Sequence, residues 1–155
     1  MGKINLTAVI FLCISALVIA SNGYCAKEMG GMKMGIFEKV SKEVKAKDGV
    51  KEISYEQFMS IRNSGERYIL VDVLSPDSYS QGHIKGAISF PMDTINKQAV
   101  AKMLPKGTNV IVYCGSFQCG ASTASAKKLS GFGYNVLDYK GGLKEWQEKG
   151  NRLVK

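Results

Sequence analysis

A nearly unbroken apolar run at residues 68–73 constrains the fold of this chain more than any other feature. Such a run is typical of a strand that is buried on both faces of a sheet. Further strands are predicted at residues 50–54, 87–90, 110–113 and 135–139, and helices at residues 55–64, 94–104, 121–130 and 143–149. This alternation predicts an α/β fold in which helices cover both sides of a parallel sheet.

The first 26 residues are predicted to be a secretory signal peptide. Lys3 supplies a positive start, and an apolar core follows at residues 6–20. A retained membrane anchor is the alternative, but about 15 apolar residues fall short of the roughly 20 that a spanning helix needs. We therefore expect cleavage within or just after residues 20–26 and a periplasmic or secreted protein. The fate of Cys25 depends on the cleavage site.

Residues 27–49 are predicted to form a Gly-rich and Met-rich tether followed by a short amphipathic helix. Three methionines of the tether could hold a soft metal such as Cu(I), but no His or Cys lies beside them, so a flexible linker is favoured and no metal site is predicted. Beyond them, Ile36, Phe37, Val40 and Val44 share one helical face, which predicts a helix from residue 36 to about residue 47. The main domain is placed at residues 50–153.

Composition and charge place the chain among ordinary globular proteins. It is 45% apolar and 22% charged, with a formal net charge of +8. Its lysines are spread along the chain with acidic residues between them, which indicates a solvated surface rather than a nucleic-acid-binding stripe. We expect a monomer without a nucleic-acid partner, whose basic charge attracts small anions or an acidic partner.

Cys114 directly follows the strand predicted at residues 110–113 and opens a loop that leads into a helix. Sites in parallel α/β sheets lie beyond the carboxyl ends of the strands. The loop N–H groups and the helix dipole are expected to lower the pKa of the Cys114 thiol, which makes it a candidate nucleophile. A buried structural cysteine is the alternative. The residues predicted to cradle the sulfur are Gly115, Ser116, Phe117, Gln118, Cys119 and Gly120.

Three spaced stretches of the chain together resemble the rhodanese (sulfurtransferase) family. The first runs from Leu70-Val-Asp-Val73 through Pro76-Asp-Ser-Tyr79 and Gly82-His-Ile-Lys-Gly-Ala87 to Phe90-Pro91. The second is Tyr113-Cys114 with its loop and a helix of small residues, and the third is Gly131-Phe132 followed by Lys140-Gly-Gly-Leu-Lys-Glu-Trp146. Each piece alone is weak, but the three in this order are specific. The resemblance covers roughly residues 50 to 153.

This resemblance implies a sheet of five mostly parallel strands with helices on both faces. It also implies that Cys114 is the catalytic residue, which carries sulfane sulfur as a persulfide from a small sulfur-containing anion or persulfide donor to a thiol acceptor. That acceptor could be a protein, and no cofactor is required. Backbone N–H groups of residues 115–119 would hold the negative terminal sulfur, with Ser116 and Gln118 as additional donors. Asp72 and His83 are expected to give structural support, although each could instead assist catalysis.

Two departures from the family pattern bear on the sulfur donor. Cys119 stands where many members have a basic residue, and Leu74 stands where an arginine is common. Loss of both charges weakens the case for thiosulfate, a dianion, and favours polysulfide, a persulfide or a protein donor. The same loss disfavours the phosphatases of this fold, which need a guanidinium clamp.

The second cysteine of the loop leaves the function open between three hypotheses. Cys119 is either a resolving thiol that attacks the Cys114 persulfide or a small residue that fills the loop mouth. If both cysteines cycle as a redox pair, the protein is a thiol–disulfide oxidoreductase rather than a sulfurtransferase. A non-enzymatic module that binds polysulfide sulfur and delivers it to a membrane-bound partner is the third hypothesis.

Overall fold

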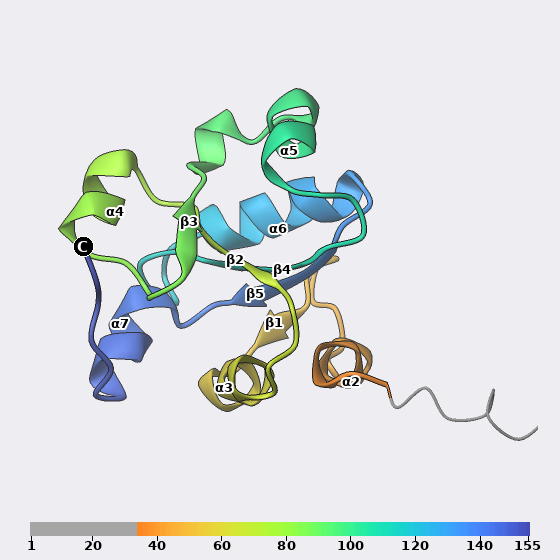
Figure 1. Cartoon of the computed structure of the whole chain (residues 1–155), viewed down its shortest axis with the longest axis horizontal. Helices are drawn as coiled ribbons and strands as arrows, with labels where there is room; N and C mark the ends of the chain where they lie inside the picture. The colour runs from red at the N-terminus through yellow and green to blue at the C-terminus, as the bar shows by residue number, and fades with distance from the viewer. Residues whose placement is uncertain (1–33) are drawn as a thin grey trace, which may run out of the picture. The chain divides into compact units, whose positions relative to one another are not determined.

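The computed structural model describes residues 34–155 (Figure 1). The predicted signal peptide, Cys25 and the tether up to residue 33 lie outside the described residues. In chain order the elements are α2 (Ile36–Glu43), β1 (Glu52–Ile53), α3 (Tyr55–Asn63), β2 (Ile69–Asp72), α4 (Pro76–Gln81), β3 (Ala87–Ser89), the 3₁₀ helix η1 (Met92–Thr94), α5 (Lys97–Met103), β4 (Asn109–Tyr113), α6 (Ala121–Gly131), β5 (Asn135–Tyr139) and α7 (Gly142–Glu148). None of the helices in this part of the chain is long and apolar enough to cross a membrane.

Within residues 34–155 the strands form one five-stranded sheet in the order β1-β5-β4-β2-β3, and every neighbouring pair is parallel. The register pairs Asp72 with Tyr113 and Tyr113 with Tyr139. The last residues of β2, β4 and β5 therefore lie side by side, and the segments that follow them meet at one edge. The predicted α/β fold class is confirmed.

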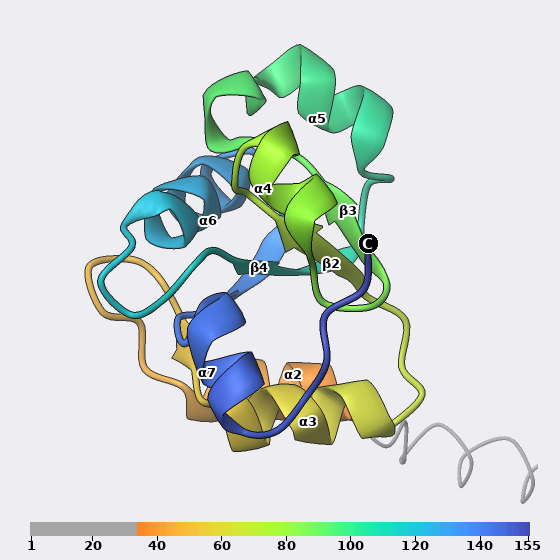
Figure 2. The same cartoon turned by 90° about the vertical axis from the view of Figure 1, so that its left-hand side faces the viewer.

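The central strand β4 divides the core into two clusters. Val110 and Val112 pack with the residues of α5 and α6, whereas Ile111 and Tyr113 pack with those of α2, α3 and α7. Figures 1 and 2 show these two groups of helices on opposite faces of the sheet. All four side chains are 0% exposed, as expected for a strand that is covered on both faces.

The helix boundaries follow from local capping. Ser54 forms a capping box with Gln57 at the start of α3. Asn96 accepts hydrogen bonds from the N–H groups of Gln98 and Ala99, so α5 begins at Lys97. The helix that was predicted at residues 94–104 therefore begins three residues later than expected, and Thr94 instead ends η1.

Two further elements differ from the prediction. Helix α2 ends at Glu43, before the predicted end near residue 47, although it buries Phe37 and Val40 as its amphipathic pattern indicates. Helix α4 was not predicted. Ser75 caps it and Pro76 occupies its first position, but none of its residues is buried, so it has no apolar periodicity to detect.

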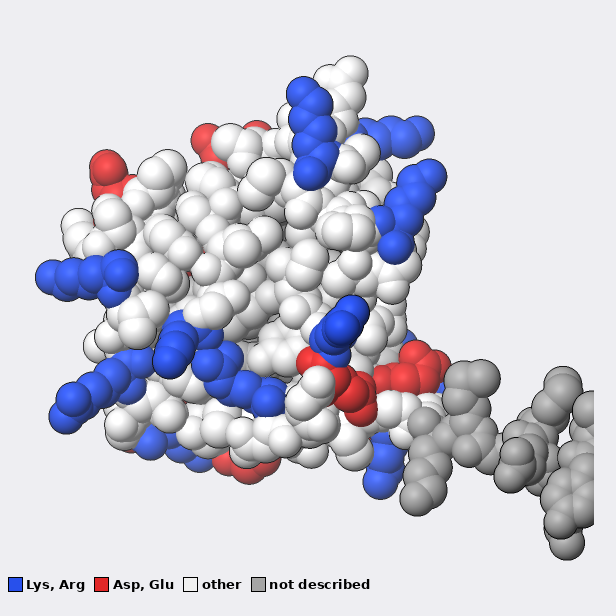
Figure 3. All heavy atoms as spheres, in the orientation of Figure 1, with Lys and Arg blue, Asp and Glu red and all other residues white. Residues whose placement is uncertain are grey.

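Charged side chains do not form one continuous basic stripe on the face drawn in Figure 3. Lysine and arginine side chains gather at the lower left and also stand at the upper and right margins, acidic side chains lie mainly at the top and the lower right, and the centre is uncharged. This distribution agrees with the solvated surface that the interleaved charges of the sequence predict.

Candidate active site

Cys114 lies one residue beyond the end of β4, at the carboxyl edge of the sheet. Its side chain is 0% exposed. The Sγ atom lies 3.3 Å from the hydroxyl oxygen of Ser122, 3.4 Å from the carbonyl oxygen of Cys119 and 3.9 Å from the carbonyl oxygen of Ser116. One hydroxyl and two carbonyl oxygens thus lie close to this sulfur.

The loop between β4 and α6 satisfies several of its polar groups internally. The N–H of Cys119 donates to the carbonyl oxygen of Ser116 at 3.0 Å, and the Ser116 hydroxyl donates to the Gln118 Oε1 atom at 3.0 Å. Phe117 is 55% exposed at the loop tip. Ser116 and Gln118 therefore bond to each other in this state, and their role as side-chain donors to a persulfide stays a prediction.

Burial raises the pKa of the Cys114 thiol, and a hydrogen bond shared with the Cys119 side chain raises it further. The hydroxyl and N–H of Ser122 act in the opposite direction but do not outweigh these effects. The predicted lowering of the Cys114 pKa is therefore wrong for the resting loop. The physical reason is that a buried thiolate loses hydration, while the two neighbouring carbonyl oxygens offer it no hydrogen atom.

Cys119 has the environment that was predicted for Cys114. Partial burial would raise the pKa of its thiol, but hydrogen bonds from the Cys114 side chain and from the N–H groups of Ala121 and Gly115 outweigh burial, and the positive charge of Lys140 adds to them. The pKa of Cys119 is consequently lowered. Both cysteines are free, and Cys119 is only partly buried.

Lys140, Thr123 and Asp138 extend the site beneath the loop. The Lys140 ammonium donates to the Cys119 carbonyl oxygen at 2.6 Å and to Thr123 Oγ1 at 2.9 Å. Thr123 in turn donates to Asp138 Oδ2 at 2.8 Å, and Asp138 is 0% exposed. Burial raises the pKa of this carboxyl group against the opposing effects of Ser122, Thr123 and Lys140. Sequence reasoning missed these residues, although Lys140 stands directly before the Gly141-Gly142 pair.

Helix α7 holds the first part of the loop. The N–H of Leu143 donates to the Cys114 carbonyl oxygen at 3.0 Å, and the N–H of Lys144 donates to the Gly115 carbonyl oxygen at 2.9 Å. Gly142 has a φ of +59°, and a Cβ atom built on it would lie 2.1 Å from the Cys114 carbonyl oxygen. The glycine pair, which sequence reasoning explained by a tight turn, also allows two backbone segments to approach each other closely.

Of the two predicted supporting residues, Asp72 ends β2 and His83 lies between α4 and β3. Asp72 is 0% exposed, and its Oδ1 atom accepts a hydrogen bond from the N–H of Leu74 at 2.9 Å. His83 stacks on Tyr79 with 3.8 Å between the ring centroids, and its Nδ1 atom lies 3.1 Å from the Tyr79 carbonyl oxygen. These contacts are of the kind that structural support requires, and the role of each residue stays a prediction.

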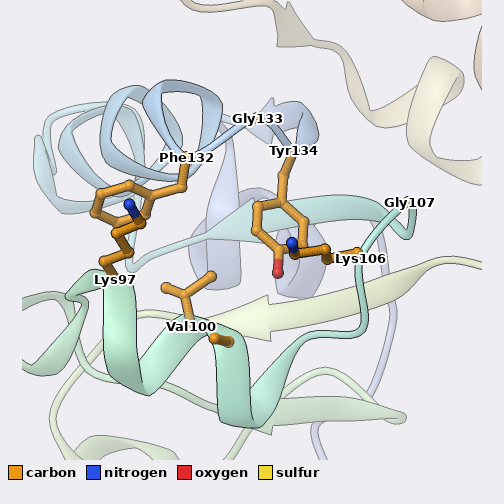
Figure 4. A pocket seen from close by; sticks show the side chains of 8 residues that line it. Lys97, Val100, Lys106, Gly107, Phe132, Gly133 and Tyr134 are labelled. Atoms are coloured by element: carbon orange, nitrogen blue, oxygen red, sulfur yellow. The ribbon is translucent and has the colours of Figure 1, made fainter.

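Two hollows differ in their relation to the loop. One, of about 320 Å³, is lined by Lys97, Lys106, Phe132 and Tyr134 among others, and it lies at the amino ends of the strands (Figure 4). The other, of about 300 Å³, lies at the carboxyl edge and is lined by Val73, Leu74, Ser75, Pro76, Pro91, Met92, Asp93 and Ala121. Only the second lies beside the Cys114 loop, because Ala121 begins α6. Within residues 34–155, no group of three or more His, Cys, Asp or Glu side chains is arranged to hold a metal ion.

Comparison with known proteins identifies the family. The Rhodanese-like domain family matches residues 54–149. The thiosulfate sulfurtransferase PspE of Escherichia coli is 34% identical over 76 residues, which cover 48% of this chain and 70% of the relative. A sulfurtransferase of Allochromatium vinosum is 30% identical over 105 residues, which cover 68% of this chain and 95% of the relative. The crystal structure of the BH2092 protein from Bacillus halodurans is 30% identical, with a TM-score of 0.60 over 66% of this chain and 75% of that chain.

The family, the fold and the enzyme class agree with the interpretation of the three sequence stretches. Five parallel strands with helices on both faces are present, and relatives that match the chain are named sulfurtransferases. The sequence prediction of a rhodanese-type sulfurtransferase is thereby confirmed at the level of the class. This chain belongs to the rhodanese-like domain family.

Proposed function

We propose that this protein carries sulfane sulfur as a persulfide on Cys114 and passes it to a thiol acceptor. One observation carries the proposal: in a chain of this family, the Cys114 sulfur lies at the carboxyl end of the central strand, enclosed by the loop that leads into α6. The carboxyl ends of strands are where parallel α/β sheets place their reactive groups.

The proposed reaction consists of two displacements at sulfur. A thiolate attacks a sulfane sulfur of the donor, a new S–S bond forms, and the electron pair of the broken donor bond leaves with the shortened donor. An acceptor thiolate then attacks the outer sulfur of the persulfide and releases the protein thiolate. The N–H groups at the start of α6 favour the negative outer sulfur, because they lie at the positive end of an eleven-residue helix.

We propose polysulfide or a small persulfide as the donor class. The hollow beside the loop is bordered by Leu74, Pro91, Met92 and Ala121, and its one charged lining residue is the acidic Asp93. Thiosulfate is a compact dianion and gains most from charge-assisted contacts, whereas the longer sulfur chain of a polysulfide also gains from apolar surroundings. The Escherichia coli relative is named a thiosulfate sulfurtransferase, so thiosulfate is the donor to compare directly.

Intact-protein mass spectrometry tests the proposal on the chain as it exists. Exposure to polysulfide should add one sulfur atom that a reductant removes, and Cys114→Ser should abolish transfer to a thiol acceptor while circular dichroism stays unchanged. Serine nearly matches the volume of cysteine and cannot form a persulfide. Undiminished turnover by this variant would contradict the proposal.

The same measurement distinguishes the oxidoreductase hypothesis. Both cysteines are free and belong to the same loop, so a Cys114–Cys119 disulfide is a chemically sensible product. Loss of two hydrogens without any gain of sulfur, on exposure to polysulfide, would favour a redox pair over a sulfur carrier.

We further propose that the protein is exported. The support is the apolar segment at residues 6–20 behind Lys3 in the sequence. Peptide mass analysis of the protein from its native cell should find a mature N-terminus at or just after residues 20–26. An intact N-terminus in the membrane fraction would overturn this proposal.

A further inference from the structure

We infer that Cys119 is the thiol that first accepts sulfur from the donor and that it then passes this sulfur to Cys114. The inference deepens the proposed function and rests on it, since it assumes that a persulfide is carried on this loop. It replaces both earlier interpretations of Cys119, the resolving thiol and the residue that fills the loop mouth.

Access distinguishes the two sulfurs. The Cys114 side chain is 0% exposed, whereas Cys119 is only partly buried near the end of the loop. A donor molecule must contact the sulfur that attacks it, so Cys114 could react first only after the loop had moved. Cys119 is partly exposed with the loop as it stands.

The groups around the two sulfurs also favour a thiolate on Cys119 over a thiolate on Cys114. The Cys114 sulfur lies near the carbonyl oxygens of Ser116 and Cys119, which repel a thiolate, while its hydrogen-bond donors come from Ser122. The N–H groups of Gly115 and Ala121 instead lower the pKa of the Cys119 thiol. These donors favour a thiolate on Cys119, in accord with the lowered pKa of its thiol and the raised pKa of Cys114.

Lys140 acts as a positioning residue for this thiolate. Its ammonium is fixed by the Cys119 carbonyl oxygen at 2.6 Å and by Thr123 Oγ1 at 2.9 Å. Thr123 is fixed in turn by the buried Asp138 carboxyl group. The chain thus brings a positive charge from the end of β5 to the position where the loop itself lacks a basic residue.

The relay needs no external oxidant or reductant after the donor has reacted. The Cys119 thiolate attacks a sulfane sulfur of the polysulfide, and the shortened polysulfide leaves with the electron pair of the broken bond. The Cys114 sulfur then attacks the outer sulfur of the Cys119 persulfide. A bond from the outer sulfur to Cys114 forms, its bond to Cys119 breaks, the electron pair returns to the Cys119 thiolate, and the Cys114 proton moves to the outer sulfur.

Single-cysteine variants test the order of the two steps. Cys114→Ser and Cys119→Ser are mixed with inorganic polysulfide, quenched at short times and analysed by intact mass and fragment spectra. Cys114→Ser should still gain one sulfur, on Cys119, because the serine hydroxyl keeps a hydrogen-bond donor beside that thiol. Cys119→Ser should gain sulfur at least about tenfold more slowly than Cys114→Ser, because attack depends on the thiolate fraction of the attacking thiol. Cys114→Ala and Cys119→Ala repeat the test in case a serine hydroxyl disturbs the loop.

The outcomes separate this inference from the proposed function. If wild type gains sulfur but neither Cys114 variant does, Cys119 is not the first acceptor. The same conclusion follows if loss of Cys119 leaves the loading rate unchanged and only prolongs the persulfide or lowers sulfide release, as for a resolving thiol. If Cys119 takes up sulfur but loss of Cys114 leaves transfer to the acceptor undiminished, Cys119 is the first acceptor, but the transfer to Cys114 and the proposed function of Cys114 are both wrong.

Substitution of Lys140 tests whether its charge stabilises the Cys119 thiolate, because loss of a purely structural residue would not shift the pH profile of Cys119 alkylation. In Cys114→Ser, the pH profile for alkylation of Cys119 should shift to higher pH when Lys140→Met is added, whereas Lys140→Arg should restore it. Cys114, Lys140 and Asp138 are the titratable groups that face this thiol or its anchor. An unchanged profile in the methionine variant would show that Lys140 does not stabilise the Cys119 thiolate.

Discussion

Gly142→Ala offers a quantitative test of the contact between α7 and the reactive loop. The new Cβ would lie 2.1 Å from the Cys114 carbonyl oxygen and 3.0 Å from the Gly115 carbonyl carbon, and both atoms belong to the backbone. The left-handed conformation at Gly142 costs a residue with a Cβ about 1–2 kcal/mol. Relief of the overlap would break the hydrogen bonds from Leu143 and Lys144 to the loop, at about 1 kcal/mol each. We therefore expect the free energy of unfolding to fall by about 3–4 kcal/mol.

Urea denaturation followed by circular dichroism measures this loss, and Gly150→Ala is the matched control. Gly150 also has a positive φ, of +83°, but a Cβ there meets nothing within 4 Å. Its substitution should cost only the conformational strain, about 1–2 kcal/mol. Sulfur loading should slow in Gly142→Ala and stay unchanged in Gly150→Ala. Equal losses of stability in the two variants would refute the argument from the close approach.

Three further predictions concern stability. Ser54→Ala removes the capping box with Gln57 and should lower the unfolding free energy by about 1 kcal/mol in urea, whereas an unchanged midpoint would show that the cap contributes nothing. Burial raises the pKa of Asp72 above its ordinary value of about 3.9, so its contribution to stability is complete below that pH and is lost as the pH rises through the raised value. Between about pH 4 and pH 7, the unfolding free energy of Asp72→Asn should therefore fall less than that of wild type. Profiles of unfolding free energy against pH that run parallel in the two proteins would contradict this. Tyr134→Phe removes a 2.7 Å hydrogen bond to the Leu104 carbonyl oxygen and should cost about 0.5–1.5 kcal/mol by thermal or urea unfolding, so equal stability would exclude this bond as a contributor.

The sheet could be predicted because its strands are apolar on both faces. The run at residues 110–113 alternates between the two core clusters, and every one of its side chains is apolar or aromatic. Helix α4 could not be found in the same way, since it is six residues long and buries none of them. Its signals were Ser75 and Pro76, which belong equally well to a turn.

The position of the candidate nucleophile could also be predicted, but its electrostatic environment could not. Cys114 follows a buried strand in the sequence, and the structure places it at the strand end. The way the loop folds back decides which of the two sulfurs is stabilised by the loop N–H groups. The sequence pattern does not predict that geometry. Lys140 reaches Cys119 from β5, 21 residues further along the chain, so only the parallel register brings the two together.

The place of β1 in the sheet has a consequence for synthesis on the ribosome. In the described sheet β1 pairs with β5 alone, and its partners there are Asp138 and Tyr139. The first strand to be made therefore has no neighbour until almost the whole domain has been translated, and its pairing closes a very long loop. Such distant pairing is slow and leaves apolar surface uncovered in the meantime. A nascent chain of this topology completes its sheet only after translation is nearly finished, so slowing the ribosome before residue 135 should not hasten folding.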